Sequence, residues 1–132
     1  MMQVLQPPGW ARPKGYSNGI ATRGGKLVFV AGQVGWSGDG NWREAGFAGQ
    51  FRQALANVLA VLAEAGGEPA HVARLTWYVL DKQEYLAALN DVGAAYRELM
   101  GRHYPAMTVV QVSGLVEDRA RLEIEATAVV PD

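Results

Sequence analysis

Two glutamates near the C-terminus are the residues best placed for acid–base chemistry. Glu123 and Glu125 alternate with apolar residues over Leu122–Ala128, and side chains two apart in a strand point to the same face. One face of this strand is therefore apolar and the other carries two carboxylates. A carboxylate that accepts a hydrogen bond from water makes that water a better nucleophile and can pass its proton to a leaving amine. The simpler alternatives are a solvated Glu123 or one paired with Arg121 across a subunit interface, and a structural salt bridge for Glu125.

The sequence offers little for metal or phosphate chemistry. There is no cysteine, and His71 and His103 are the only two histidines. We therefore expect no metal site and no cofactor. The glycines of Gly38–Gly40 are not followed by the lysine of a phosphate-binding loop.

Charge and hydropathy indicate a small-molecule partner. Twelve basic residues against 13 acidic ones leave a net charge of −1, which gives no electrostatic reason to expect nucleic acid or an anionic membrane. The N-terminus lacks a basic stretch followed by a long apolar core, and no apolar run approaches the ~18 residues that span a bilayer. We expect a cytoplasmic protein without membrane contact.

Periodicity predicts five strands and two helices in the order ββαβαββ. Apolar residues spaced by three and four mark one helix from Phe47 to Leu62 and a second from a cap at Asp81 and Glu84 to Gly101. The predicted strands are Tyr16–Thr22, Lys26–Gly32, Arg74–Leu80, Ala106–Val112 and Arg119–Val130.

The N-terminal third carries two local predictions. Its proline- and glycine-rich opening indicates an ordered loop. The pair Gly24-Gly25 suits a tight turn, so Tyr16–Thr22 and Lys26–Gly32 are predicted to form an antiparallel hairpin. The second of these strands has no alternation, which is typical of a strand covered on both faces.

Together these elements predict an α+β domain spanning residues 1–132. Helices inserted between strands imply crossover connections, so a mixed sheet with both helices on one face is the economical architecture. The second face of the sheet must then meet solvent or another subunit.

Five short motifs occur in order along nearly the whole chain. They are Gly15-Tyr16-Ser17, Val28-Phe29-Val30-Ala31-Gly32-Gln33, Gln53-Ala54-Leu55-Ala56-Asn57, Pro105-Ala106-Met107-Thr108 and Leu122-Glu123-Ile124-Glu125-Ala126. With this element order, the chain resembles the RidA/YjgF family, also described as endoribonuclease L-PSP-like. The resemblance implies a chorismate-mutase-like fold and a homotrimer with ligand sites in the clefts between subunits.

The resemblance also implies a chemistry. The family's deaminases hydrolyse a reactive enamine or imine to a keto acid and ammonia. By position, Tyr16 would line the cleft, Gly32 would offer backbone near the substrate, Thr108 would sit beside the reacting carbon, and Glu123 would position the attacking water. Met107 would also face the substrate.

Met107 is a departure, because the family's deaminases carry arginine at this position to grip the substrate carboxylate. A thioether cannot form the two parallel hydrogen bonds of a guanidinium. The expected substrate is therefore a small metabolite other than the usual 2-imino acid. Arg12 or Lys14 could supply a substitute cation, and His103 a proton carrier, although surface or structural roles are the simpler readings of all three.

Three hypotheses remain open at the level of sequence. The first is an enamine or imine hydrolase, and the second is a non-catalytic ligand-binding or regulatory trimer. An endoribonuclease is the least supported, because no basic patch with interleaved aromatics is visible. Tryptophans Trp36, Trp42 and Trp77 could line an apolar ligand cavity or serve packing.

Overall fold

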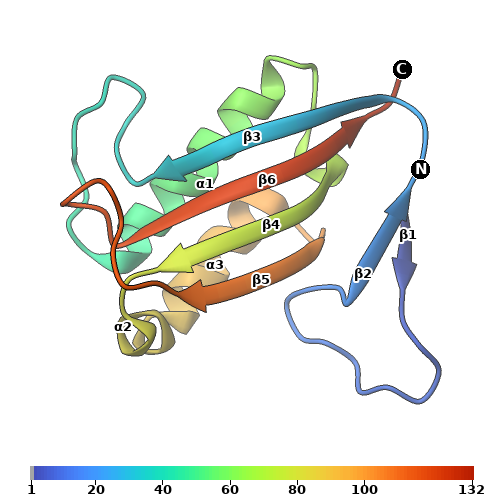
Figure 1. Ribbon diagram of the computed structural model, residues 1–132, viewed down its shortest axis with the longest axis horizontal. Coiled ribbons are helices and arrows are strands. Elements are labelled where there is room, and N and C mark those ends of the chain that lie inside the picture. Colours follow the sequence, from blue (N-terminus) through green and yellow to red (C-terminus); the bar gives the residue numbers. More distant parts are fainter. Residues whose placement is uncertain (1) are drawn as a thin grey trace.

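The computed structural model describes residues 2–132 as a four-stranded sheet with helices on one face, flanked by a separate two-stranded sheet (Figure 1). The strand order in the larger sheet is β3-β6-β4-β5. Its strands are β3 (Lys26–Val34), β4 (Val72–Val79), β5 (Ala106–Gln111) and β6 (Leu122–Val130). The helices are α1 (Phe47–Ala63), the 3₁₀ helix η1 (Pro69–His71), α2 (Lys82–Ala87) and α3 (Leu89–Met100). The smaller sheet pairs β1 (Met2–Leu5) with β2 (Gly19–Thr22).

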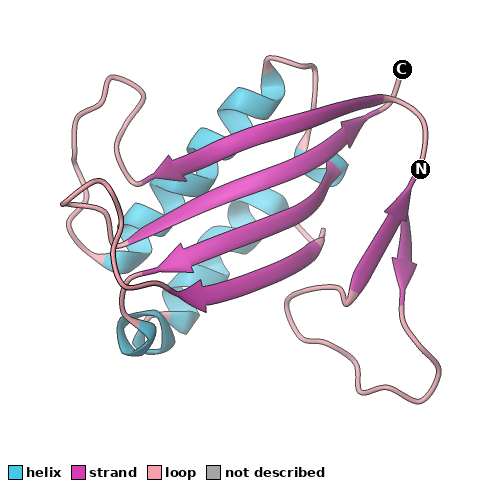
Figure 2. Ribbon diagram, viewed as in Figure 1, coloured by secondary structure: helices cyan, strands magenta, loops and turns pink. Residues whose placement is uncertain are grey.

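The larger sheet is mixed, as predicted. β6 pairs antiparallel with β3 and with β4, whereas β4 and β5 run parallel. The parallel pair needs a crossover, and α2 and α3 provide it. Both long helices, α1 and α3, lie behind the sheet in Figure 2, so the α+β architecture with helices on one face is confirmed.

The core lies between the sheet and the long helices. Along β6 the burial alternates strictly, and Leu122, Ile124 and Ala128 have no exposed surface while Glu123 and Glu125 are only half-buried. Phe51 and Leu55 of α1 are also fully buried. The alternation predicted from the sequence is confirmed, and it fixes both glutamates on the face away from the helices.

The face away from the helices, called here the open face, is not covered within one chain. Phe29 of β3 is 74% exposed and Leu27 is 57% exposed. Both pair with open-face positions of β6, Thr127 and Val129. The prediction that β3 is covered on both faces is therefore wrong for the single chain. Its apolar run instead leaves two large hydrophobic side chains exposed on the open face.

The predicted hairpin is wrong as well. Gly24 and Gly25 adopt positive φ angles of 72° and 77°, so the turn forms. However, β2 pairs with β1, and β3 pairs with β6. The turn redirects the chain, but the strands on its two sides, β2 and β3, do not pair with each other. β3 instead pairs with β6 in the larger sheet, where Val30 is buried in the core. The opening segment, predicted as a loop, contains strand β1 before its first proline.

The second predicted helix is two helices. The chain leaves helical geometry at Ala88 (φ −101°, ψ 9°), which separates α2 from α3. Asp81 caps α2 as predicted by accepting from the backbone N–H groups of Gln83 and Glu84 at 2.9 and 3.4 Å. Gly101 ends α3 with φ 65°, as predicted.

None of the helices in residues 2–132 is both long and apolar enough to cross a membrane.

Candidate active site

The first half of the site is on the open face, where Glu123 lies against Gly32. A Cβ built on Gly32 would come within 2.8 Å of Glu123 Cδ, so no other residue type fits without moving the carboxylate. A bulge brings them together: Val30 pairs with Ala126 and Gln33 with Ile124, so two residues of β3 face one of β6. Glycine is required here by close approach rather than by φ angle.

Tyr78 of β4 completes this half of the site. It pairs across the sheet with Glu123 and donates a 2.5 Å hydrogen bond from its hydroxyl to Glu125 Oε1. This hydrogen bond, followed by partial burial and the charges of Glu125 and Glu123, raises the pKa of the Tyr78 phenol. Glu125 thus accepts from a phenol and makes no salt bridge within the described chain, contrary to expectation. Sequence reasoning missed Tyr78 because only cross-strand register places it beside the glutamates.

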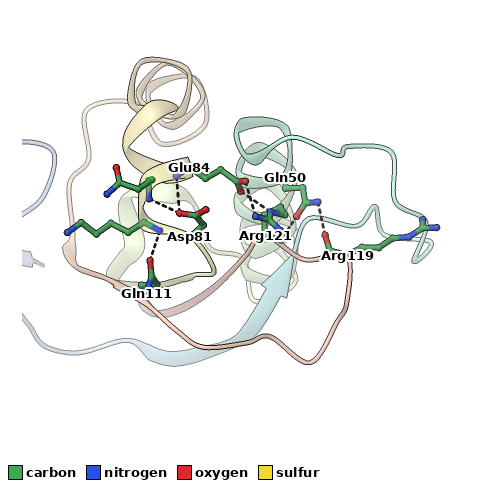
Figure 3. Close-up of polar contacts among 8 residues, drawn as sticks. Gln50, Asp81, Glu84, Gln111, Arg119 and Arg121 are labelled. Atoms are coloured by element: carbon green, nitrogen blue, oxygen red, sulfur yellow. Dashed lines mark hydrogen bonds and ion pairs between the residues drawn. The ribbon is translucent and has the colours of Figure 1, made fainter.

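A polar network holds Arg121, the residue immediately before β6 and two residues before Glu123 (Figure 3). Gln50 of α1 is 2% exposed, and its amide accepts from the Arg121 N–H at 2.8 Å and donates to the Arg119 carbonyl at 2.9 Å. The Arg121 guanidinium forms two 2.9 Å hydrogen bonds with the carboxylate of Glu84. Arg121 is therefore already paired within its own chain, so an ion pair with Glu123 of another subunit would have to compete with Glu84.

The second half of the site is built around Tyr16, in the segment before β2, and Met107 of strand β5. Ser17 is buried, its N–H donates to the Pro105 carbonyl at 3.0 Å, and its hydroxyl donates to the Tyr104 carbonyl at 2.5 Å. These bonds hold the Gly15-Tyr16-Ser17 motif beside the Pro105-Ala106-Met107-Thr108 motif. Two segments about 90 residues apart in sequence thereby share one cavity.

This cavity has a volume of about 290 Å³. Met107 and Val109 contribute apolar surface from β5, and Tyr16 lies at 41% exposure. Burial raises the pKa of the Tyr85 phenol, so this wall of the cavity is neutral. The full lining is Lys14, Gly15, Tyr16, Trp77, Tyr85, Met107 and Val109. Sequence reasoning missed Tyr85 and Val109, because their periodicity indicated only core packing.

The two halves lie on opposite faces of one sheet. Met107 pairs with Leu75, a fully buried core residue, so its side chain is on the helix side, whereas Glu123 is on the open face. Thr108 pairs with Thr76, which is opposite Glu125, and it is exposed on the open face. A single chain thus brings Tyr16 together with Met107, and Gly32 together with Glu123, but not the two pairs with each other.

Of the remaining candidates, Lys14 and Trp77 line the Met107 cavity and the others fall outside both halves. His103 Nε2 is 2.6 Å from the Val72 carbonyl, and the His103 carbonyl accepts from the Tyr96 hydroxyl, so this histidine is structural. Trp36 and Trp42 pack together at 5.8 Å and line other cavities than Trp77. Lys14 lines the Met107 cavity, and Arg12 does not. Within residues 2–132, no three side chains of His, Cys, Asp or Glu cluster as a metal site would require.

The sequence profile of the family described as Endoribonuclease L-PSP matches residues 10–130. The chain belongs to the RidA/YjgF family. A RutC family protein of Pyrococcus horikoshii is 34% identical over 130 residues, covering 97% of this chain and 98% of the relative. A protein of Escherichia coli named 2-iminobutanoate/2-iminopropanoate deaminase is 31% identical over 108 residues, covering 80% of each chain.

Among solved structures, that of YyfB from Yersinia pestis, described as a Rid family protein of unknown function, superimposes with a TM-score of 0.86 at 30% identity. The match covers 98% of both chains. This RidA/YjgF member thus resembles relatives named for imine deamination and relatives with no assigned activity.

Proposed function

We propose that this RidA/YjgF protein is a cytoplasmic homotrimer that hydrolyses a small enamine or imine, other than the usual 2-imino acid, to a carbonyl compound and ammonia. The observation that carries the proposal is the contact of Glu123 with Gly32 on the open face, which leaves the carboxylate half-buried beside exposed backbone. Names of relatives such as the E. coli 2-iminobutanoate/2-iminopropanoate deaminase support the reaction class.

Assembly of the complete site requires two subunits. Glu123 of one subunit would meet the Tyr16–Met107 cavity of its neighbour where the open face of one sheet packs beside strand β5 of the next. Exposed Phe29 and Leu27 on the open face support such packing, because burying them removes apolar surface from water. Each subunit of a closed ring would then contribute to two sites.

The chemistry needs only water. Glu123 accepts a hydrogen bond from a water molecule, whose oxygen attacks the imine carbon as the proton moves to the carboxylate. The protonated carboxyl then delivers that proton to nitrogen, which gives a carbinolamine. Glu123 next moves the proton of the carbinol hydroxyl to the amine, the carbon–nitrogen bond breaks, and ammonia leaves as the carbinol oxygen becomes a carbonyl. No oxidation state changes, and an enamine enters the same route after tautomerising to the imine.

The decisive experiment is an ammonia-release screen over imines generated by amine and amino-acid oxidases, with parent, Glu123→Gln and Glu125→Gln compared on any active substrate. Glu123→Gln should lose about 10² to 10⁴ in kcat, because the amide cannot take the water's proton. Glu125→Gln makes the same chemical change on the same strand face and should retain most activity. Equal activity of parent and Glu123→Gln would refute the assigned role.

A non-catalytic ligand-binding trimer is the second candidate, and Met107 is the observation that favours it. This residue leaves the cavity without the guanidinium that would orient a carboxylate. Ligand binding without ammonia release from any imine in the screen would support this alternative. Endoribonuclease activity would instead appear as RNA cleavage that survives Glu123→Gln.

A further inference from the structure

A cavity of about 400 Å³ on the open face borders the first half of the site. Its polar lining consists of Arg74 and Thr76 from β4 with Glu125 and Thr127 from β6. The strand register fixes their common face, because Arg74 pairs with Thr127 and Thr76 pairs with Glu125. The cavity therefore holds one cation and one carboxylate on the face that also carries Glu123.

Arg74 is the cation of this cavity, and it has no anionic partner within residues 2–132, where the three salt bridges involve other arginines. Glu125 is a diagonal neighbour of both Arg74 and Tyr78, and long side chains at diagonal positions of one sheet face can meet. The partner of Glu125 is Tyr78, whose hydroxyl donates to it at 2.5 Å. Arg74 is left with an exposed guanidinium that can bind an anion from outside the chain.

The proposed interface offers Arg74 no carboxylate from the neighbouring subunit. Residues 1–38 and 99–116, which bring the tyrosine and the methionine of the Met107 cavity, contain no aspartate or glutamate. The charged residue in the lining of that cavity is Lys14, a cation like Arg74. The anion that neutralises Arg74 is therefore expected on a ligand bound between the subunits.

The position of Arg74 sets how far that anion lies from the reacting carbon. Tyr78 is directly across from Glu123, and Arg74 is four residues before Tyr78 on β4. At about 3.3 Å per residue these positions are about 13 Å apart along the sheet, and the arginine side chain spans only part of this distance. A carboxylate bonded directly to the imine carbon cannot reach Arg74 while Glu123 holds the water. A carboxylate at the end of a carbon chain can, and the exposed Phe29 in the cavity wall offers apolar contact to that chain.

We propose that Arg74 binds the carboxylate of the substrate, and that a spacer of several apolar carbons separates this carboxylate from the imine carbon. The inference rests on the proposed function and names its substrate class: imines and enamines of oxo acids whose carbonyl is remote from the carboxylate. Arg74 thus supplies, at a different place, the anchor that the Met107 cavity lacks. Water adds to the imine carbon and ammonia leaves as described above, while the carboxylate keeps its charge and its bonds.

The test compares two isomeric ketones, 5-oxohexanoate and 2-oxohexanoate, which have the same atoms and charge and differ in the distance from ketone to carboxylate. Calorimetry on the assembled protein should show that 5-oxohexanoate binds about tenfold or more tightly. Arg74→Gln should lose this preference, and Arg74→Lys, which keeps the charge without the bidentate geometry, should retain part of it. Arg119→Gln makes the same change at an exposed arginine of another cavity and should keep the full preference.

A second variant tests the guanidinium without altering Arg74. Tyr78→Phe removes the hydroxyl that holds Glu125, so this carboxylate becomes free to pair with Arg74 and should weaken the binding of 5-oxohexanoate. Adding Glu125→Gln to Tyr78→Phe removes the competing carboxylate and should restore the affinity. An Arg74 that contacts only solvent would give no response to either change.

Three results would overturn the inference. One is equal or tighter binding of 2-oxohexanoate by the parent, a comparison that needs no variant. Another is an unchanged preference in Arg74→Gln. The third is dissociation of the parent's oligomer in Arg74→Gln, measured by sedimentation, because Arg74 would then bind the neighbouring subunit. Since the readout is binding, ammonia release without the preference would contradict only this inference, and the preference without ammonia release would contradict only the proposed function.

Discussion

Glu123 and Met107 project from opposite faces of the same sheet, although the family resemblance places both at one substrate. Glu123 is across from Tyr78 on the open face, while Met107 is across from the core residue Leu75. A flat sheet cannot bring such side chains together within one chain. We therefore expect each active site to combine Glu123 of one subunit with the Met107 cavity of the next.

Subunit complementation tests this arrangement directly. Glu123→Gln removes the base and Met107→Trp fills the cavity, so each variant alone should be inactive. If the two are unfolded together and refolded as mixed rings, about a quarter of the sites should combine an intact glutamate with an intact cavity. Ammonia release near that fraction of parent activity is expected. Verified mixed trimers without activity would show that both residues act within one subunit. Activity of either variant alone would show that its residue is not required.

Restoring the carboxylate clamp is the second prediction. Met107→Arg should raise hydrolysis of 2-iminopropanoate by about one to two powers of ten, because a charge-assisted bidentate contact contributes about 1.5 to 3 kcal/mol. Met107→Leu is the matched control and should give no gain. Keto-acid formation at equal trimer concentration is the measurement. A parent as fast as arginine-bearing relatives would mean that another cation, such as Lys14, already holds the carboxylate.

A methyl group at Gly32 should damage activity more than stability. The atoms that its Cβ would meet belong to the flexible end of Glu123, so the carboxylate can turn away at little cost to folding. Gly32→Ala should therefore unfold thermally near the parent temperature while its kcat falls toward that of Glu123→Gln. Gly38→Ala adds the same methyl where nothing lies within 4 Å, and it should change neither quantity. Full activity of Gly32→Ala would show that the water does not depend on this carboxylate position.

Gln50→Leu should destabilise the protein. It leaves the Arg121 N–H and the Arg119 carbonyl without their side-chain partner. Because these two hydrogen bonds are only part-buried, the loss should fall toward the lower end of the about 1–3 kcal/mol that an unsatisfied buried group costs. A urea titration should give a lower unfolding free energy with a similar slope. Gln83→Leu makes the same substitution at an exposed position of α2 and should have little effect. Equal stability of the two variants would indicate that water replaces the lost partners.

The Tyr78 phenol should titrate above its ordinary pKa of 10.0, mainly because it donates to Glu125. Below pH 10 the donor is intact. As pH rises through the elevated folded-state pKa, the hydrogen bond is lost and the phenolate repels both glutamates, so its contribution to stability disappears on the alkaline side. Glu125→Gln should lower this pKa toward 10. Tyrosinate absorbance, with Tyr78→Phe identifying the signal, is the measurement, and an unchanged titration in Glu125→Gln would contradict the assignment.

Local patterns predicted elements well and pairings poorly. The alternation along β6 and the spacing along α1 depend on one buried face each, so Leu122–Val130 and Phe47–Ala63 could be identified from sequence. The turn at Gly24-Gly25 is equally local, but it carries no information about which strand β3 joins. Strand choice depends on burial of Val30 in a sheet built from distant segments.

The same limit applies to the candidate site. Resemblance supplied Tyr16, Gly32, Met107, Thr108 and Glu123. Strand alternation separates the adjacent Met107 and Thr108, but no linear pattern says which residues of different strands share a face. Tyr78 and Trp77 are neighbours in sequence, yet one contacts Glu125 on the open face and the other lines the Met107 cavity. Alternation along β4 puts the two side chains on opposite faces, and the register between strands decides which residues each of them meets.

Because of the bulge, the number of residues in β3, and not only their types, determines which side chains face Glu123. Without it, continuing the pairing from Val30 and Ala126 would set Gly32 opposite Ile124 in the core and Gln33 opposite Glu123. A glutamine amide would then occupy the space that the attacking water needs. Deleting Ala31 would straighten the strand yet keep Gln33 opposite Ile124. An engineered variant could therefore lose one residue of β3 at the bulge while Gly32 and Gln33 keep their faces of the sheet. A shift of the pairing with β6 without any deletion would instead exchange the faces of these two residues.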